Sequence, residues 1–251
     1  MAIQLRVPAF AFLALTLAAP AGAQRRFPPD SLTNLKYYSK TIPVRALIDS
    51  MRQFSFALGV RCTYCHVGEE GQPLATYDFA KDDKRPKRTA RVMLHMVEHI
   101  NGEHLADVPE RSNPPVVVAC MTCHRGRPTP VELEDRLART LADSGLDATV
   151  REYRALRERF YGTAAYDFRR GLLVLASAQL SASRPDDALG LLRLNAEFFP
   201  ESGQTVFLMG EAWIAKGDTA QAVERYRAAL AMDSTLARGV QQRLRGLGVE
   251  P

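Results

Sequence analysis

The chain has 251 residues, of which 46% are hydrophobic and 24% are charged, and its formal net charge is +5. This composition is typical of a globular protein that is long enough to bury one large or two small cores without disulfide cross-links. The modest positive charge gives no indication of nucleic-acid binding, and after residue 23 no segment is long and apolar enough to cross a membrane.

The N-terminus has the pattern of a secretory signal peptide. Arg6 precedes the apolar run VPAFAFLALTLAAPAGA, which ends in small residues. We predict a signal peptide over residues 1–23 that is cut before Gln24, so that the mature protein works in the periplasm or another exported location. An uncleaved anchor is the alternative, and Pro8 and Pro20 leave too little uninterrupted helix for it.

A helix is predicted upstream of the first cysteine. In VRALIDSMRQFSFALG, apolar residues recur at spacings of 4, 3 and 4, so they share one helical face. These residues are Leu47, Met51, Phe54 and Leu58. Pro43 lies near the start of this helix and Gly59 is a stop signal. The helix should therefore end just before the cysteine motif that follows.

All four cysteines stand in one five-residue pattern that occurs twice, as CTYCH at 62–66 and CMTCH at 120–124. Cysteines two residues apart can form a redox disulfide, but a thioredoxin-type site needs a βαβ context that this sequence lacks. A four-cysteine zinc ribbon separates its pairs by about 15 to 20 residues, whereas 54 residues lie between Cys65 and Cys120. Neither a redox disulfide nor a zinc ribbon explains why a histidine directly follows each cysteine pair.

The CxxCH pattern is typical of c-type haem attachment. The two thiols form thioethers to the vinyl groups of a haem, and the adjacent histidine then ligates the iron. We predict two covalently attached haem c groups, with the upstream apolar helix covering the first porphyrin. The thioether and proximal ligand residues are Cys62, Cys65, His66, Cys120, Cys123 and His124. A second protein ligand in the sixth coordination position of the iron favours electron transfer, whereas an open sixth position permits oxygen or peroxide chemistry.

Between the motifs, the stretch KDDKRPKRTAR at 81–91 is locally basic. We interpret it as a solvated loop that leads into a helix, with a steering patch for an acidic redox partner as the alternative. The segment TARVMLHMVEHINGEHL then predicts a helix that stops at Asn101 and Gly102. Its apolar face carries Met93, Met96, Val97 and Ile100.

Two histidines, His95 and His99, lie four residues apart on another face of this second helix. Exposed surface histidines are the ordinary interpretation of such a pair. A metal or haem ligand pair is the alternative, because residues i and i+4 of a helix can reach one ion.

The stretches MRQFSFALGVRCTYCH, ARVMLHMVEHINGEHL and VVVACMTCHRGRPTP resemble one half of the cytochrome c subunit of photosynthetic reaction centres. The resemblance covers roughly residues 30–130. In that family a methionine of the helix before each haem segment takes the sixth iron position. The resemblance implies Met51 as the distal ligand of the first haem and Met93 as that of the second, with Met96 as the fallback for Met93. That subunit carries four haems, whereas this chain has two motifs, so a place beside a reaction centre is not implied.

After the second motif the cysteines stop and helical patterns follow. The segments ELEDRLARTLADSG and ATVREYRALRERFYG predict an antiparallel helix pair. From residue 169 onward a period of 34 residues appears, in which Leu172, Leu175, Ala188 and Leu192 recur as Val206, Met209, Ala222 and Tyr226. Small residues such as Gly210 let the two helices of a hairpin approach closely. The pattern is similar to the tetratricopeptide repeat.

These patterns together predict a mainly α-helical protein in which a small dihaem c-type cytochrome domain precedes an α-helical hairpin repeat domain. We expect the cytochrome domain over residues 24–130, a connecting helix pair over 131–168, and tetratricopeptide-like repeats with a capping helix over 169–251.

The expected function is that of an exported electron carrier rather than an enzyme with its own substrate. Redox proteins would be its electron donor and acceptor, and the repeats would dock a protein partner or brace the haem domain. Two alternatives stay open. One is a dihaem peroxidase-like enzyme with one displaceable axial ligand, and the other is a scaffold whose haems sense redox state.

Overall fold

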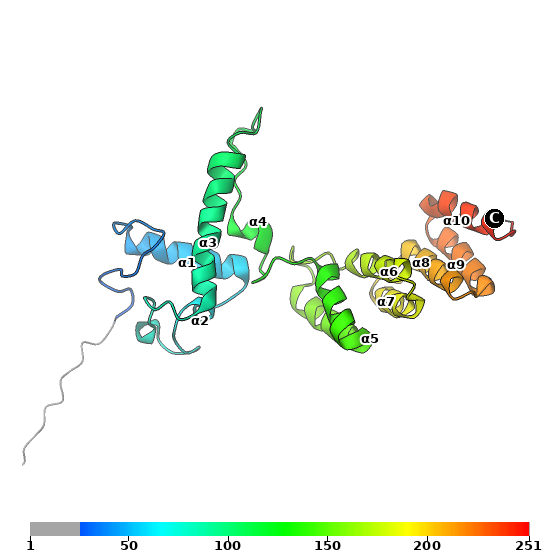
Figure 1. Cartoon of the computed structure of the whole chain (residues 1–251), viewed down its shortest axis with the longest axis horizontal. Helices are drawn as coiled ribbons and strands as arrows, with labels where there is room; N and C mark the ends of the chain where they lie inside the picture. The colour runs from blue at the N-terminus through cyan, green and yellow to red at the C-terminus, as the bar shows by residue number, and fades with distance from the viewer. Residues whose placement is uncertain (1–25, 251) are drawn as a thin grey trace, which may run out of the picture. The chain divides into compact units, whose positions relative to one another are not determined.

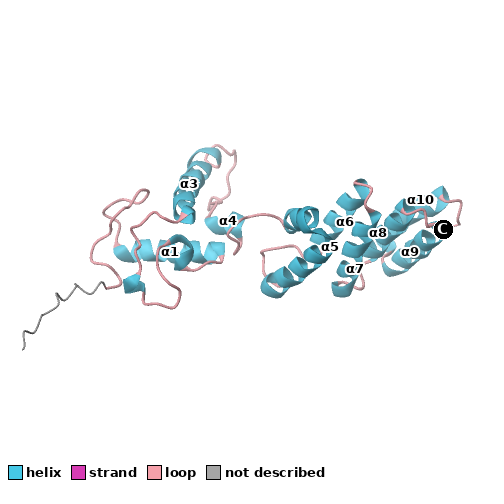
Figure 2. Ribbon diagram, turned by 60° about the horizontal axis from the view of Figure 1, so that its bottom comes forward, coloured by secondary structure: helices cyan, strands magenta, loops and turns pink. Residues whose placement is uncertain are grey.

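The computed structural model describes residues 26–250, so the predicted signal peptide at 1–23 lies outside the described residues. The described chain is mainly α-helical, as predicted, and it forms no strand beyond the isolated bridge between Val67 and Asp78 (Figure 2). No helix in this part of the chain has the length and apolar character needed to cross a membrane.

The described residues form two compact units. The first unit contains the chain up to Asp49 together with Cys62–His95, and the second contains Ser50–Arg61 together with the chain from Met96 onward. The boundary between them therefore passes through helices α1 (Val44–Leu58) and α3 (Arg85–His99), which are labelled in Figure 1.

Helix α1 is the helix predicted upstream of the first motif. It ends at Leu58, and Gly59 follows with a φ of +65°, a left-handed conformation that glycine adopts without strain. A Cβ atom at position 59 would lie 2.1 Å from the carbonyl oxygen of Gly126. In the same place the amide of Gly126 donates to the carbonyl of Ala57 over 2.8 Å. Glycine at 59 is thus required both by the backbone angle and by this close approach.

The first unit also holds α2 (Cys62–Cys65), the 3₁₀ turn η1 (Leu74–Thr76) and the start of α3. The loop before α3 is fixed by Lys87, whose Nζ donates to the carbonyls of Phe79, Ala80 and Lys81 over 2.9, 3.0 and 2.7 Å. The Asp82 carboxylate accepts two bonds from the Arg91 guanidinium, of 2.9 and 2.8 Å.

The basic stretch at 81–91 is therefore only partly as predicted. A helix does begin inside it, at Arg85. The interpretation as solvated charge is wrong for Lys87 and Arg91, whose side chains are only 12% and 22% exposed. These cations are covered because they neutralise Asp82 and satisfy backbone carbonyls of the loop, contacts that a sequence pattern does not display.

In the second unit, α3 does not simply stop at Asn101 and Gly102. Its α-helical part ends at His99, and the chain continues as the π-helical turn η2 (Ile100–His104). The short helix α4 (Cys120–His124) carries the second motif. Helix α5 (Leu133–Phe160) follows and breaks at Gly145, where φ is +78° and ψ is −179°. The parts of α5 before and after Gly145 contact each other, and Arg136 Nε donates a hydrogen bond to Glu152 Oε1 over 2.6 Å.

Five further helices complete the second unit (Figure 1). They are α6 (Gly171–Ser181), α7 (Pro185–Phe198), α8 (Gly203–Ala215), α9 (Thr219–Met232) and α10 (Ala237–Gly246). Pro185 is the first residue of α7, and the side chains of Ser202 and Asp218 cap α8 and α9 by accepting backbone N–H bonds. Successive helices are joined by short turns, which gives stacked helical hairpins.

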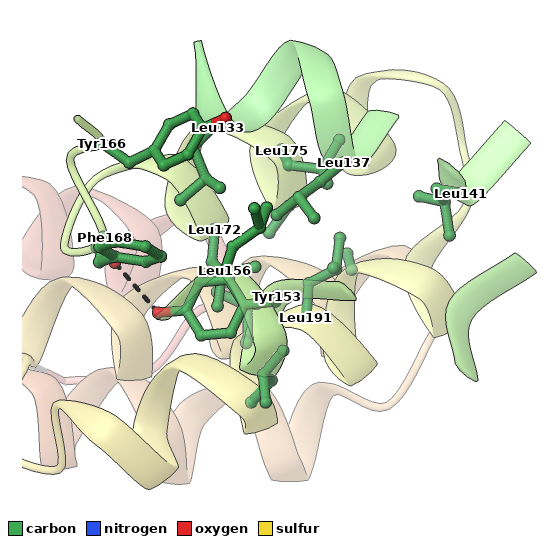
Figure 3. Close-up of a cluster of buried hydrophobic side chains, with 14 of the residues drawn as sticks. Leu133, Leu137, Leu141, Tyr153, Leu156, Tyr166, Phe168, Leu172, Leu175 and Leu191 are labelled. Atoms are coloured by element: carbon green, nitrogen blue, oxygen red, sulfur yellow. Dashed lines mark hydrogen bonds between the residues drawn. The ribbon is translucent and has the colours of Figure 1, made fainter. Parts of the chain in front are cut away.

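The larger core of the second unit joins α5 to the first hairpin. Leu133, Leu137, Tyr153, Leu172 and Leu191 are among its fully buried members (Figure 3). The Tyr153 hydroxyl donates to the carbonyl of Phe168 over 3.3 Å, so this buried polar group is satisfied. A smaller core forms where α10 covers α9, through Ala222, Tyr226, Val240 and Leu244.

Candidate haem attachment sites

Each cysteine pair lies on its own short helical segment, α2 for Cys62 and Cys65 and α4 for Cys120 and Cys123. Residues three apart on a helical turn share one face, so the two thiols of a pair can reach the same ligand. All four cysteines are free thiols. Burial raises the pKa of Cys65 and of Cys120. This direction is opposite to the lowered thiol pKa that a thioredoxin-type site needs.

The histidine of the first motif is held in its neutral form. Burial, and after it the positive charge of Lys87, lowers the pKa of His66 to about 4. Its ring meets that of Phe79 edge-on, with 5.0 Å between the ring centres. At neutral pH the imidazole is therefore uncharged and carries a nitrogen lone pair, which is the form that ligates a metal.

The histidine of the second motif is fixed by a hydrogen bond. His124 Nδ1 lies 2.8 Å from the carbonyl oxygen of Arg127, and the Arg127 amide donates to the His124 carbonyl over 2.9 Å. A carbonyl oxygen can only accept, so Nδ1 carries a proton, and in the neutral imidazole Nε2 then keeps its lone pair. Metal-ligating histidines are commonly fixed in this way, with the second ring nitrogen donating to a carbonyl or carboxylate.

Within residues 26–250, no group of three or more His, Cys, Asp or Glu side chains comes together in a metal-binding arrangement. The second-helix histidines have other partners as well. His99 Nδ1 lies 2.8 Å from Glu103 Oε1, and the ring of His95 packs against Tyr37 with 5.0 Å between the ring centres.

The residues around the motifs fit a large apolar prosthetic group. Of the described residues before Arg127, only two apolar residues, Ala57 and Tyr77, are buried. The predicted apolar face of α1 is half-buried, and Phe56 beside it is 77% exposed. A segment of this length is not stabilised by so small a core. A porphyrin joined to the cysteines would supply the missing apolar surface.

The methionines predicted as distal ligands lie on the two helices as expected. Met51 on α1 and Met93 on α3 are half-buried, whereas Met96 is 44% exposed. Met93 belongs to the unit that contains Cys62–His66, and Met51 belongs to the unit that contains α4. The pairing of Met51 with the first motif and Met93 with the second stays a prediction.

Two residues that support the motifs are not evident from sequence patterns. Asn101 is read from sequence as a stop signal, yet its side-chain amide forms two bonds of 2.8 Å with the backbone N–H and C=O of Val118, just before the second motif. Lys84 is read as surface charge, yet its Nζ donates to the carbonyl of Thr63 inside the first motif.

Part of the chain is similar in sequence to known cytochromes. Residues 62–152 match the family described as the photosynthetic reaction centre cytochrome C subunit. This part of the chain is similar in sequence to a cytochrome c. Cytochrome c-554 of Chloroflexus aurantiacus is 33% identical over 107 residues, which cover 39% of this chain and 23% of that protein.

The photosynthetic reaction center cytochrome c subunit of Rubrivivax gelatinosus is 35% identical to this chain over 72 residues, which cover 29% of this chain and 16% of that protein. The chain thus spans less than a quarter of the length of each of these relatives. No solved structure matches it.

Proposed function

We propose that this chain is an exported c-type cytochrome that carries two covalent haems and passes single electrons between redox proteins. The observation that carries the proposal is the CxxCH pattern, present twice on short helices, with each histidine neutral or fixed in the tautomer that leaves a ring nitrogen for iron. The cytochrome relatives described above support the same chemistry for residues 62–152.

The roles of the residues follow from this proposal. The four cysteines bind the vinyl groups, and His66 and His124 are the proximal ligands. Met51 and Met93 are the distal ligands, with Met96 as the fallback. When bound, each haem supplies an iron centre that gains and loses one electron. With a histidine and a methionine bound, each iron would have no open position, which favours electron transfer over reaction with oxygen or peroxide.

The proposal extends to the rest of the chain. Residues 1–23 direct export, residues 24–130 form the dihaem domain, and residues 131–168 connect it to tetratricopeptide-like repeats over 169–251. The regular hairpins α6–α7 and α8–α9 support a repeat that braces the haem domain or docks a redox partner.

A haem count on protein matured in an exporting host tests the proposal. The pyridine haemochrome assay should give two covalent haems per chain. The double variants C62A/C65A and C120A/C123A should each retain one, because each loses one pair of thioether bonds. A ratio of one in the unmutated protein would contradict the dihaem assignment.

The ferric absorption spectrum of the same preparation tests the distal ligands. A closed His–Met site shows a sulfur-to-iron charge-transfer band, so Met51→Ala and Met93→Ala should each remove about half of it. Met96→Ala tests the fallback: it should leave the band intact if Met93 is the ligand, and it should remove about half of the band in place of Met93→Ala if Met96 is the ligand. High-spin ferric iron with peroxide turnover in the unmutated protein would instead favour the peroxidase-like alternative.

A further inference from the structure

Arg127, three residues after His124, is buried in an unusual way for an arginine. It is 2% exposed, and no carboxylate within residues 26–250 pairs with its guanidinium. Nε donates to the His124 carbonyl over 3.2 Å, and a terminal nitrogen donates to the carbonyl of Val131. Burying a charge without a counter-ion is costly unless other groups compensate. Its position therefore calls for a specific compensation.

The compensation comes from the helical core. The Cζ atom of Arg127 lies 4.6 Å from the centre of the Tyr166 ring, which is within the range of a cation–π contact. Tyr166 is itself 8% exposed and meets Phe160 and Phe168 edge-on, with ring centres 5.5 and 5.9 Å away. Figure 3 shows it among the buried residues of the core that α5 shares with α6 and α7.

On its other side Arg127 contacts the second haem motif through three hydrogen bonds. Its carbonyl accepts from His124 Nδ1, while its amide and its Nε both donate to the His124 carbonyl. The backbone that orients the imidazole thus belongs to the residue whose side chain is anchored on Tyr166. A movement of Tyr166 would be transmitted to His124 through a single side chain.

We propose that Arg127 is a positioning residue for the second haem, which fixes the His124 ligand against the helical domain through its stacking on Tyr166 and places a buried positive charge beside that ligand. This inference rests on the proposed attachment of a haem to the second motif. A fixed cation near an iron disfavours the oxidised form, which has one more positive charge than the reduced form. Arg127 therefore raises the reduction potential of the second haem and leaves that of the first unchanged.

Potentiometric titration of the full-length dihaem protein tests this proposal, with haem number checked in every variant. Arg127→Met should lower the potential of one haem and leave the other at its wild-type value. Arg127→Lys keeps the charge but loses the planar guanidinium group, so the reduction potential of this haem should lie between its values in the wild type and in Arg127→Met. Arg125→Met is the matched control, because Arg125 is exposed and its charge is screened by solvent.

Substitutions at Tyr166 separate positioning from charge alone. Tyr166→Leu removes the ring that anchors the guanidinium, so it should lower the reduction potential of the second haem, as Arg127→Met does. Tyr166→Phe keeps the ring and should leave the potential unchanged. Two results would overturn the proposal in a protein that carries both haems. In the first, Arg127→Met changes neither reduction potential; in the second, Arg125→Met lowers the potential of the second haem as much as Arg127→Met does. A protein with no haem on the second motif would instead refute the proposed function.

Discussion

At the scale of single residues, the Asp82 carboxylate of the first unit is held by several donors. Hydrogen bonds from Arg91, and then from Asn34 and Lys87, hold the pKa of this carboxyl well below its usual range. A carboxyl with a lowered folded-state pKa stabilises the fold above the ordinary aspartate pKa of about 3.9. That contribution is lost as the pH falls from there toward the folded-state value.

The loss of stability caused by substituting Asp82 should therefore become smaller as the pH falls. Asp82→Asn should lower the melting temperature at pH 7 by a few degrees, and its difference from wild type should narrow as the pH falls from 5 to 2. Thermal unfolding followed by circular dichroism at several pH values measures this. Asp83→Asn, at an exposed neighbouring carboxyl, is the control. If Asp82→Asn and Asp83→Asn changed the melting temperature equally at every pH, the stabilising role of the Asp82 carboxylate would be contradicted.

At the scale of elements, the approach of α8 to α9 depends on Gly210. A Cβ atom there would lie 2.6 Å from Cε1 of Tyr226. The Tyr226 ring cannot move aside easily, because it is fully buried and its hydroxyl bonds to Glu211. Burial, followed by the bond to Glu211, also raises the pKa of this tyrosine far above its usual range.

Gly210→Ala should consequently destabilise the protein by about 1–3 kcal/mol, the usual range for an overpacked contact. Urea denaturation followed by helical circular dichroism measures this free energy. Gly239→Ala inside α10 is the matched control, because its Cβ would make only an ordinary contact of 3.8 Å with Phe207. It should be neutral or stabilising by up to about 1 kcal/mol. Equal effects of the two substitutions would argue against close helix packing at Gly210.

Helix positions could be predicted from the sequence because apolar spacing and stop signals are local. Leu47 and Met51 lie one turn apart, Gly59 follows the last turn, and α1 ends where these signals indicate. The end of α3 could not be predicted in the same way. Asn101 is bound by Val118, 17 residues later, and no local pattern records that contact. The role of Arg127 could not be predicted for the same reason, because its ring partner Tyr166 lies 39 residues later, in the loop between α5 and α6.

At the scale of the whole molecule, the chemistry-bearing residues of the candidate site could be read from sequence, whereas the extent of the helical core could not. The pattern indicates repeats from residue 169, yet the buried core is continuous from Leu133 on α5 to Leu208 on α8. Long-range packing of this kind depends on which faces meet, and apolar periodicity alone does not determine that. The proposed boundary at 168 therefore needs its own test.

Truncation provides that test. A chain ending at residue 168 should aggregate, because it exposes the leucines of α5 that α6 and α7 cover, including Leu133, Leu137 and Leu156. A chain ending at residue 130 lacks these leucines and should remain monomeric by size-exclusion chromatography. A monomeric, fully helical product ending at 168 would show that α5 folds without the repeats.

The contact between the end of α1 and the loop after the second motif has a consequence for biogenesis. The Gly126 amide binds the carbonyl of Ala57, although 69 positions separate the two residues along the chain. If the chain is exported as proposed above, α1 would emerge early, but the hydrogen bond between Gly126 and Ala57 could not form until both cysteine motifs had passed through the translocation channel. Both thiol pairs would then leave the channel before the end of the first helix is held by this bond.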